Sequence, residues 1–162
     1  MSGFAENTTF DKSNKRHNHN QVMNLTTAYK MLPLVSRIVG DILNHQCRLD
    51  VLRPEQARLD RHKRDLVWQE RERRYAVQEE ISQLGKDLQA HFSELEVLGV
   101  ALEESEVGRV GFPTLVNDRP AFFTWKLGDD SILNWHFLGE KRYRVIPKSW
   151  FEAENIPVPE NN

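Results

Sequence analysis

Residues 77–99, VQEEISQLGKDLQAHFSELEVLG, decide the fold of this chain. Apolar side chains recur in this segment at alternating spacings of four and three residues, which is the heptad pattern of an amphipathic helix. The stripe consists of Val77, Ile81, Leu84, Leu88, His91, Leu95 and Leu98. Gly99 follows, and glycine commonly ends a helix by adopting a left-handed conformation. The segment therefore predicts one long helix that ends at Gly99.

A second stripe with the same spacing comes earlier in the chain. It consists of Ile38, Ile42, His45, Leu49, Leu52, Gln56, Leu59, Lys63 and Leu66. Asn24 is the expected N-cap of this helix. Pro54 interrupts the stripe, and an internal proline costs about 3 kcal/mol. Because the stripe keeps its phase across Pro54, the sequence favours one kinked helix that reaches about residue 65. A helix break at Pro54 is the alternative.

The phase of both stripes is lost at residues 67–71, so the turn between the helices is expected there. Two long helices joined by a short turn predict an antiparallel, coiled-coil-like hairpin over residues 24–99. Residues 1–23 are polar and lack periodicity, which predicts a disordered N-terminal tail. Residues 151–162 are expected to form a C-terminal tail.

After Gly99 the apolar period changes, and short strands are expected at residues 100–102, 110–112, 121–127, 132–138 and 142–146. We expect Leu127 to lie opposite Leu133, which gives the sheet two different faces. The apolar face would hold Ala121, Phe123, Trp125, Leu127, Leu133, Trp135 and Phe137 and pack on the hairpin. The other face would hold Phe122, Thr124, Lys126, Asn134 and His136. The fold class is therefore α+β, a long antiparallel helical hairpin followed by a small antiparallel β-sheet module in residues 100–150.

The composition indicates a protein of the cytoplasm. The chain has 162 residues and a single cysteine, which excludes an intramolecular disulfide. No apolar run approaches the roughly 20 residues of a membrane span, and the first residues lack the apolar core of a secretory signal. Glycine-rich phosphate loops, His-Glu-x-x-His, nucleophile elbows and paired-cysteine metal sites are absent from the sequence. No catalytic residue, metal site or cofactor is predicted.

One group of residues in the β module is a candidate ligand site. It consists of Arg109, Trp125, Lys126, Trp135 and His136. Aromatic rings beside an imidazole and a cation suit a small anion or an aromatic ligand. The alternative is that the two tryptophans are core residues. His45 and His91 fall on the two helical stripes and are expected to pack in the hairpin core.

A second group combines basic and aromatic residues near the hairpin tip. It consists of Trp68, Arg71, Arg73 and Arg74, a candidate contact for nucleic acid, since arginines bind phosphate and aromatic rings stack on bases. Glu70 and Glu72 interleave with these residues. A solvated tip with local ion pairs is therefore favoured, and nucleic acid is not expected as a partner.

The charges are unevenly distributed along the hairpin. Residues 48–74 hold nine Lys/Arg against six Asp/Glu, and residues 75–107 hold one Lys against eight Asp/Glu. Narrow apolar stripes and opposite charges favour a homodimer in which two hairpins form a four-helix bundle. The sequence thus favours a non-enzymatic interaction or scaffold protein that self-associates. The alternative is a small-ligand or metal-binding protein, or an enzyme, with its site near Trp135 and His136.

Several ordered motifs resemble an uncharacterised bacterial family known as domain of unknown function 2203. They are LEVLGV at 95–100, GRVGFP at 108–113, WKLGD at 125–129 and WH at 135–136, preceded by a helix start at 24–33. The resemblance covers residues 24–138 and implies a helical hairpin followed by a compact β segment, without an assigned activity. Gly111 stands where the family often has Asp, and Asn134 and Phe137 replace Tyr and Glu around Trp-His. The resemblance therefore implies that any carboxylate–histidine site of the family is weakened in this chain.

Overall fold

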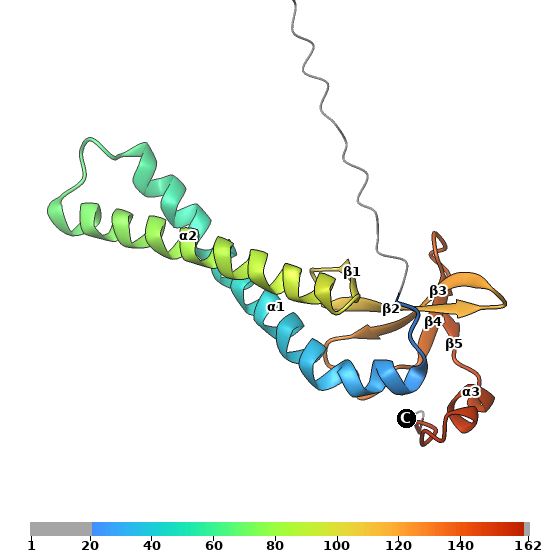
Figure 1. Ribbon diagram of the computed structural model, residues 1–162. Helices are drawn as coiled ribbons and strands as arrows, with labels where there is room; N and C mark the ends of the chain where they lie inside the picture. Colours follow the sequence, from blue (N-terminus) through green and yellow to red (C-terminus); the bar gives the residue numbers. More distant parts are fainter. Residues whose placement is uncertain (1–20, 161–162) are drawn as a thin grey trace, which may run out of the picture.

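The computed structural model describes residues 21–160, so the predicted tail at 1–23 lies outside the described residues except for its last three. Two long helices precede a five-stranded sheet and a short helix (Figure 1). The elements are α1 (Leu25–Arg61), α2 (Trp68–Val97), β1 (Ala101–Glu104), β2 (Arg109–Val116), β3 (Arg119–Lys126), β4 (Asn134–Phe137), β5 (Arg144–Val145) and α3 (Lys148–Ala153). The expected α+β class, a helical hairpin followed by an antiparallel sheet, is confirmed.

Helix α1 begins and continues as the sequence predicts. The side-chain oxygen of Asn24 accepts a hydrogen bond of 2.8 Å from the backbone N–H of Thr27, which is N-capping. Pro33 and Pro54 both lie inside the helix. Leu52 and Leu59, on either side of Pro54, are fully buried. Burial of this stripe offsets the hydrogen bond that Pro54 cannot donate.

The turn between the helices comes earlier than predicted. Helix α1 ends at Arg61 and α2 begins at Trp68, so the turn spans residues 62–67 instead of 67–71. Leu66 is buried although it lies in the turn, and its carbonyl accepts a hydrogen bond of 2.9 Å from Nε of Arg71. The heptad spacing of Leu66 therefore reflects apolar contact within a loop and not a helical turn.

The two arms of the hairpin pack along their heptad stripes. Buried members include Ile38, Ile42, Leu49, Leu52 and Leu59 of α1 and Val77, Leu84, Leu88 and Leu95 of α2. His45 and His91 stack across the arms with ring centroids 5.3 Å apart, as expected for packing within the hairpin. Gly99 adopts a φ of 74°, a left-handed conformation that ends α2.

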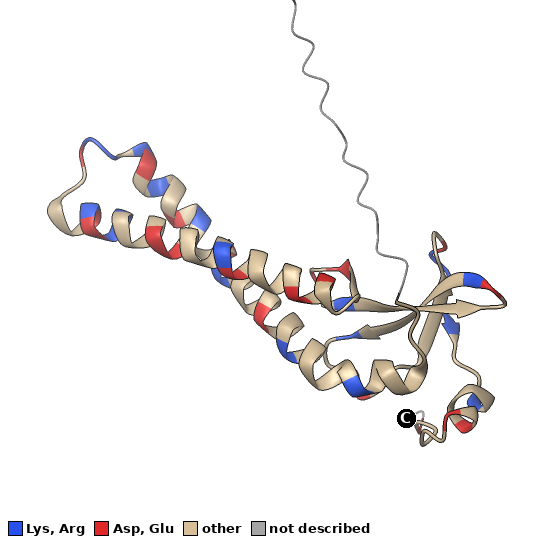
Figure 2. Cartoon of the chain, in the orientation of Figure 1, with Lys and Arg blue, Asp and Glu red and all other residues tan. Residues whose placement is uncertain are grey.

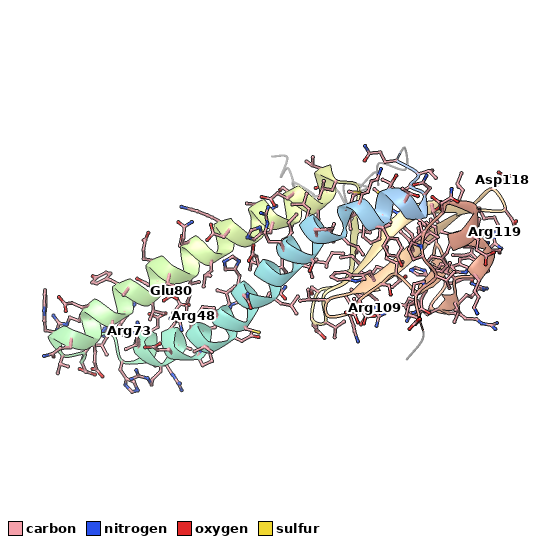
Figure 3. All side chains as sticks on the ribbon, turned by 90° about the horizontal axis from the view of Figure 1, so that it is seen from below. Arg48, Arg73, Glu80, Arg109, Asp118 and Arg119 are labelled. Carbon is pink, nitrogen blue, oxygen red and sulfur yellow. The ribbon has the colours of Figure 1, made fainter. Side chains whose placement is uncertain are left out.

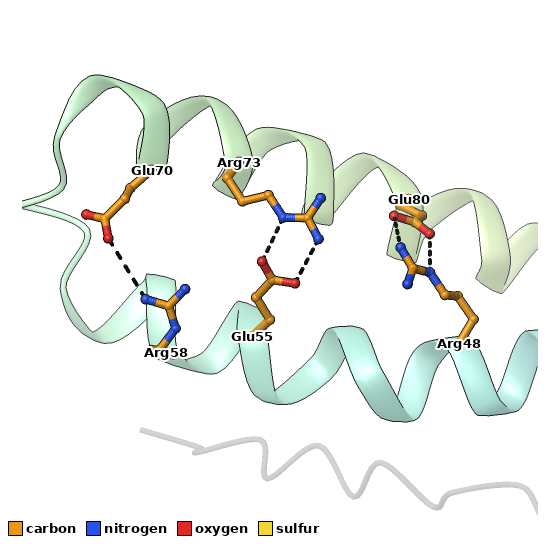
Figure 4. A network of polar contacts seen from close by, with 6 residues as sticks. All are labelled: Arg48, Glu55, Arg58, Glu70, Arg73 and Glu80. Atoms are coloured by element: carbon orange, nitrogen blue, oxygen red, sulfur yellow. Dashed lines mark hydrogen bonds and ion pairs between the residues drawn. The ribbon is translucent and has the colours of Figure 1, made fainter.

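Four ion pairs join the arms on their exposed surface. They are Arg48–Glu80, Arg73–Glu55, Arg74–Asp60 and Arg58–Glu70, the first three within 2.7 Å. Figure 4 shows all of these pairs except Arg74–Asp60. Both charge signs occur along both helices (Figure 2). The charge asymmetry of the sequence is thus partly neutralised inside one hairpin.

The sheet is an antiparallel meander with the order β1-β2-β3-β4-β5. Asn117 and Asp118 join β2 to β3 with φ angles of 51° and 59°, which is the left-handed geometry of a two-residue hairpin turn. This turn lies at the end of the molecule away from the helical tip, as the labelled Asp118 and Arg73 show in Figure 3.

The predicted register between β3 and β4 is wrong by two residues. Phe123 lies opposite Trp135, whereas the expected match of Leu127 with Leu133 would place it opposite residue 137. The reason is that Ile132 leaves the strand to reach α1, where its backbone N–H and C=O both hydrogen-bond to the hydroxyl of Tyr29. An even shift keeps the same residues on each face, so the division between the faces is as expected.

The apolar face packs on the short helix α3 as well as on α1. Trp150 lies 5.3 Å from Trp135 and 6.4 Å from Phe123 between ring centroids, and Phe151 is buried. The carboxylate of Glu154 accepts hydrogen bonds from the first backbone N–H groups of α1. The segment expected as a tail from residue 151 therefore packs on the fold at least as far as Glu154.

Candidate functional site

The two faces of the sheet separate the residues of the predicted ligand site. Trp125 and Trp135 lie on the inner face with 4% and 8% of their surface exposed. His136 lies on the outer face, because side chains alternate along β4. Arg109 and Lys126 are register partners on that same outer face. The tryptophans are thus core residues in this fold, while His136, Arg109 and Lys126 share a surface.

His136 forms a buried pair with a carboxylate that the sequence analysis did not single out. Its Nε2 lies 2.5 Å from Oε1 of Glu103, and the two side chains are 11% and 16% exposed. Glu103 belongs to β1, where an irregularity between Leu102 and Glu104 breaks the pairing with β2. The side chain of Glu103 lies over Gly111, since a Cβ atom added there would lie 2.6 Å from Oε1.

The hydrogen bonds of His136 place one proton on Nδ1 and a second between Nε2 and Glu103. Nδ1 lies 2.9 Å from the carbonyl oxygen of Phe137, which can only accept, so Nδ1 carries a proton. One further proton lies between Nε2 and Glu103, on the imidazole or on the carboxyl group, because two lone pairs cannot face each other at this distance. Both ring nitrogens are engaged. The imidazole is therefore a positioning group, and the free polar atom of the pair belongs to Glu103.

Two buried oxygen atoms of this face have no hydrogen-bond partner within the described part of the chain. They are Oε2 of Glu103 and Oγ1 of Thr124. Thr124 is the register partner of Gly111, the residue that Glu103 covers. An unsatisfied buried polar group costs about 1–3 kcal/mol, so two of them on one patch are a substantial local cost.

Aromatic and charged side chains border the pair. Phe122 stacks on His136 with ring centroids 5.5 Å apart, and the ring of Tyr143 meets His136 edge-on at 5.3 Å. The guanidinium group of Arg109 lies 5.0 Å from the Tyr143 ring and donates to Glu104. Burial, and next the charge of Glu103, raise the pKa of the Tyr143 hydroxyl above its ordinary value. Figure 3 shows Arg109 on the sheet, at a distance from the hairpin ion pairs.

Of the residues in the predicted ligand site, His136, Arg109 and Lys126 lie on this face, and the sequence analysis did not include Glu103, Thr124 and Tyr143 in that site. The substitution of Asp by Gly111 suggested a weakened carboxylate–histidine site. In the structure the same glycine leaves the space that Glu103 occupies. A glycine within a strand often marks close approach by another group. Gly111 in β2 is such a glycine, and it was the sequence signal that could have indicated a side chain above this position.

The candidate nucleic-acid residues at the hairpin tip are mostly engaged within the chain. Arg73 and Arg74 pair with Glu55 and Asp60, each at 2.7 Å, and Arg71 donates to a backbone carbonyl. Trp68 is 68% exposed. Three of the four candidate residues are therefore held by contacts within the chain.

A separate open cavity of about 560 Å³ lies between the start of α1, the β2–β3 hairpin and α3. Glu154 and Trp150 line it, and it contains neither His136 nor Arg109. Among residues 21–160, no group of three His, Cys, Asp or Glu side chains is placed to hold a metal ion. No helix in the described part of the chain combines the length and apolarity needed to cross a bilayer.

Comparison with known proteins places the chain in a family but gives it no activity. The matching family model is described as "Uncharacterized conserved protein (DUF2203)" and covers residues 21–141. This range includes Glu103, Thr124 and His136 and stops before Tyr143. No curated protein and no solved structure matches the chain. Because the family model matches well over half of the sequence, the chain belongs to the uncharacterized conserved protein family DUF2203.

Proposed function

We propose that this protein is a non-enzymatic interaction protein of the cytoplasm that self-associates through its helical hairpin. The observation that carries the proposal is the exposure of two aromatic side chains on one side of α2. Trp68 is 68% exposed and Tyr75 is 67% exposed. They are seven residues apart, which is two helical turns, so both project from the same side of the helix.

The heptad stripes themselves do not supply the contact. Leu52 and Leu59 of α1 and Val77 of α2 are fully buried between the arms of a single chain. The ion pairs between the arms hold these stripes together and reduce the charge that a second hairpin would meet (Figure 4). A second copy would therefore pack on the flank that carries Trp68 and Tyr75.

The size of this flank predicts a weak dimer. Two aromatic side chains that are about two-thirds exposed offer roughly 200–350 Å² of surface. A standard protein–protein interface buries about 800 Å² on each partner. Neighbouring polar residues of the hairpin must therefore supply more than half of the buried area on each partner. We expect dissociation in the micromolar range.

Sedimentation velocity of the full chain across the micromolar range tests the proposal. We expect the wild type to change from monomer to dimer as its concentration rises, and the double variant Trp68→Ser/Tyr75→Ser to stay monomeric. Val97→Ser is the matched control, because Val97 is 80% exposed but lies at the other end of α2. A wild type that stays monomeric up to tens of micromolar contradicts the proposal.

A small-ligand function at His136 is the second candidate. The specific observation in its favour is that one oxygen atom each of Glu103 and Thr124 is buried without a hydrogen-bond partner among residues 21–160. The corresponding experiment is a thermal shift with candidate ligands. A ligand-dependent shift that His136→Ala abolishes without unfolding the protein supports this function, and simple destabilisation by His136→Ala indicates a structural role.

A further inference from the structure

We infer that two copies of this protein pack α2 against α2 in antiparallel directions, with the basic turn of each hairpin beside an acidic side chain of its partner. The inference rests on the proposed self-association and adds the direction and the charge contacts of that dimer. Its starting point is the outer stripe of α2, a line of four exposed side chains that consists of Trp68, Glu72, Tyr75 and Glu79.

The outer stripe lies on the side of α2 that faces away from α1. Its members are separated by four, three and four residues, so they project from one side of the helix. Val77, which is fully buried between the arms, lies two residues from Tyr75 and two from Glu79. Two residues correspond to a rotation of about 200° around a helix, so the outer stripe and the buried stripe point in nearly opposite directions. A second molecule can therefore reach the outer stripe without opening the hairpin.

The outer stripe is negatively charged. Glu72 and Glu79 are exposed, and neither forms an ion pair within residues 21–160. Glu55 and Glu80, by contrast, are paired with arginines of the opposite arm. The two carboxylates of the outer stripe therefore suit a partner that brings positive charge.

The turn at the tip of the hairpin has the opposite charge. Within residues 62–67, Lys63 and Arg64 stand against a single acidic residue, Asp65. Both basic side chains are exposed, and neither forms an ion pair with a described residue. Figure 2 shows the basic colour on this turn. Each hairpin therefore carries a basic turn and an acidic stripe at the same end.

A parallel arrangement of two α2 helices brings like charges together. Glu79 would lie beside Glu79 of the partner subunit, and the two basic turns would meet, so these contacts are repulsive. Glu72 lies close to Glu72 of the partner subunit in either direction. The direction is therefore decided by Glu79 and by the turn.

An antiparallel arrangement brings opposite charges together. When Trp68 lies opposite Tyr75 of the partner subunit, the partner's turn lies beside Glu79. The reason is that Glu79 comes four residues after Tyr75, and Arg64 comes four residues before Trp68. Four helical residues span about 6 Å, which is within the reach of an arginine side chain.

The antiparallel pair is also closed. Its two-fold axis lies midway between residues 68 and 75 and repeats every contact, so no surface of this kind is left for a third copy. The dimer contains two contacts of Arg64 with Glu79 and two of Trp68 with Tyr75. The turn thus contributes part of the polar area that the aromatic side chains do not supply.

Charge reversals at Glu79 and Arg64 test the direction in sedimentation velocity of the full chain. Glu79→Lys and Arg64→Glu each replace two attractive contacts by repulsive ones, and each variant alone is expected to dimerise about tenfold more weakly than the wild type. An equimolar mixture of the two variants restores opposite charges at both contacts. We expect this mixture to form a heterodimer with near wild-type affinity.

Glu96→Lys and Arg142→Glu are the matched controls. They make the same changes of charge at exposed residues that form no ion pair within the described part of the chain, one at the other end of α2 and one in the β module. Because salt screens charges at that distance, each control should change dimerisation by less than about twofold. A loss in the controls equal to that in Glu79→Lys and Arg64→Glu would overturn the inference.

Wild-type affinity in both Glu79→Lys and Arg64→Glu would also overturn the antiparallel direction, because a parallel pair keeps like charges together after either change. If Trp68→Ser/Tyr75→Ser is monomeric in the same experiment, the proposed self-association stands and only the inferred direction fails. A wild type that stays monomeric up to tens of micromolar contradicts both, and would assign the outer stripe to a basic segment of another protein.

Discussion

Carboxylates pair with basic side chains in two very different settings in this protein. In the hairpin, the side chains of Arg48 and Glu80 are 45% and 36% exposed, and each is free to exchange its partner for water. In the sheet, the side chains of His136 and Glu103 are 11% and 16% exposed, and the pair spans from β1 to β4 across two intervening strands.

The difference in burial gives the two kinds of pair different roles. Exposed ion pairs contribute little net stability because water competes for both charges. They align the arms of the hairpin at a fixed register. A buried pair is costly to break, since the remaining partner stays desolvated and unpaired. We therefore expect the hairpin to tolerate charge changes better than the outer face of the sheet does.

Glu103→Ala should have the largest effect. It leaves Nε2 of His136 buried without its partner, and we expect a loss of about 2–4 kcal/mol in the free energy of unfolding. Urea denaturation followed by circular dichroism measures the change. Glu103→Gln keeps a hydrogen-bonding group and should lose less. A loss below about 1 kcal/mol in Glu103→Ala would mean that the pair is not buried as described.

Gly111→Ala should have the next largest effect. Its Cβ atom would lie 2.6 Å from Oε1 of Glu103, so Glu103 must move away from His136, with an expected loss of about 1–3 kcal/mol. In the double variant with Glu103→Ala the clash with Glu103 is removed and only the 3.0 Å approach to the Phe122 ring remains, so the two effects should not add. Strict additivity in urea denaturation of the four proteins would show that Glu103 does not lie over residue 111.

The ion pairs of the hairpin should lose their contribution to the free energy of unfolding at acidic pH. Hydrogen bonds from Arg73 and Arg48 lower the pKa values of Glu55 and Glu80 below 4.5. Their stabilising contribution is therefore complete above pH 4.5 and is lost as the pH falls through the lower folded-state values. Urea midpoints of the wild type and of Arg48→Gln/Arg73→Gln should converge below pH 4.5. A difference that persists unchanged in acid would contradict the pairing.

The smallest expected effect is a change in the pKa of the Tyr143 hydroxyl. Burial raises the pKa of its hydroxyl first, and the nearby charge of Glu103 raises it further. Glu103→Gln removes the second cause only, so the pKa of Tyr143 should fall but stay above 10. An NMR titration of the Tyr143 ring in the wild type and in Glu103→Gln measures this change. An unchanged Tyr143 titration would place its hydroxyl outside the influence of Glu103.

The hairpin was predictable from sequence because its signal is local. The stripe through Leu52 and Leu59 specifies both the face of α1 and its continuity across Pro54. The turn was misplaced because neither glycine nor proline marks residues 62–67, and Leu66 continues the apolar spacing inside the loop.

The outer-face site was only partly predictable because it depends on pairing between distant residues. Alternation along β4 placed His136 opposite the core but could not determine which side chain would meet it. Glu103 lies 33 residues earlier, beside an irregularity in an edge strand that no periodicity marks. The predicted register of β3 with β4 was wrong by two residues for a similar reason. The hydrogen bond between Ile132 and Tyr29 joins residues far apart in the sequence, and no local pattern indicates it.

The pairing of His136 with Glu103 is the central structural claim, and ¹⁵N NMR of the imidazole tests it most directly. We predict a protonated Nδ1, because the Phe137 carbonyl accepts from it. We also predict a hydrogen-bonded Nε2 whose signal moves strongly in Glu103→Gln. An Nε2 signal typical of a solvent-exposed imidazole, unchanged by Glu103→Gln, would contradict the account.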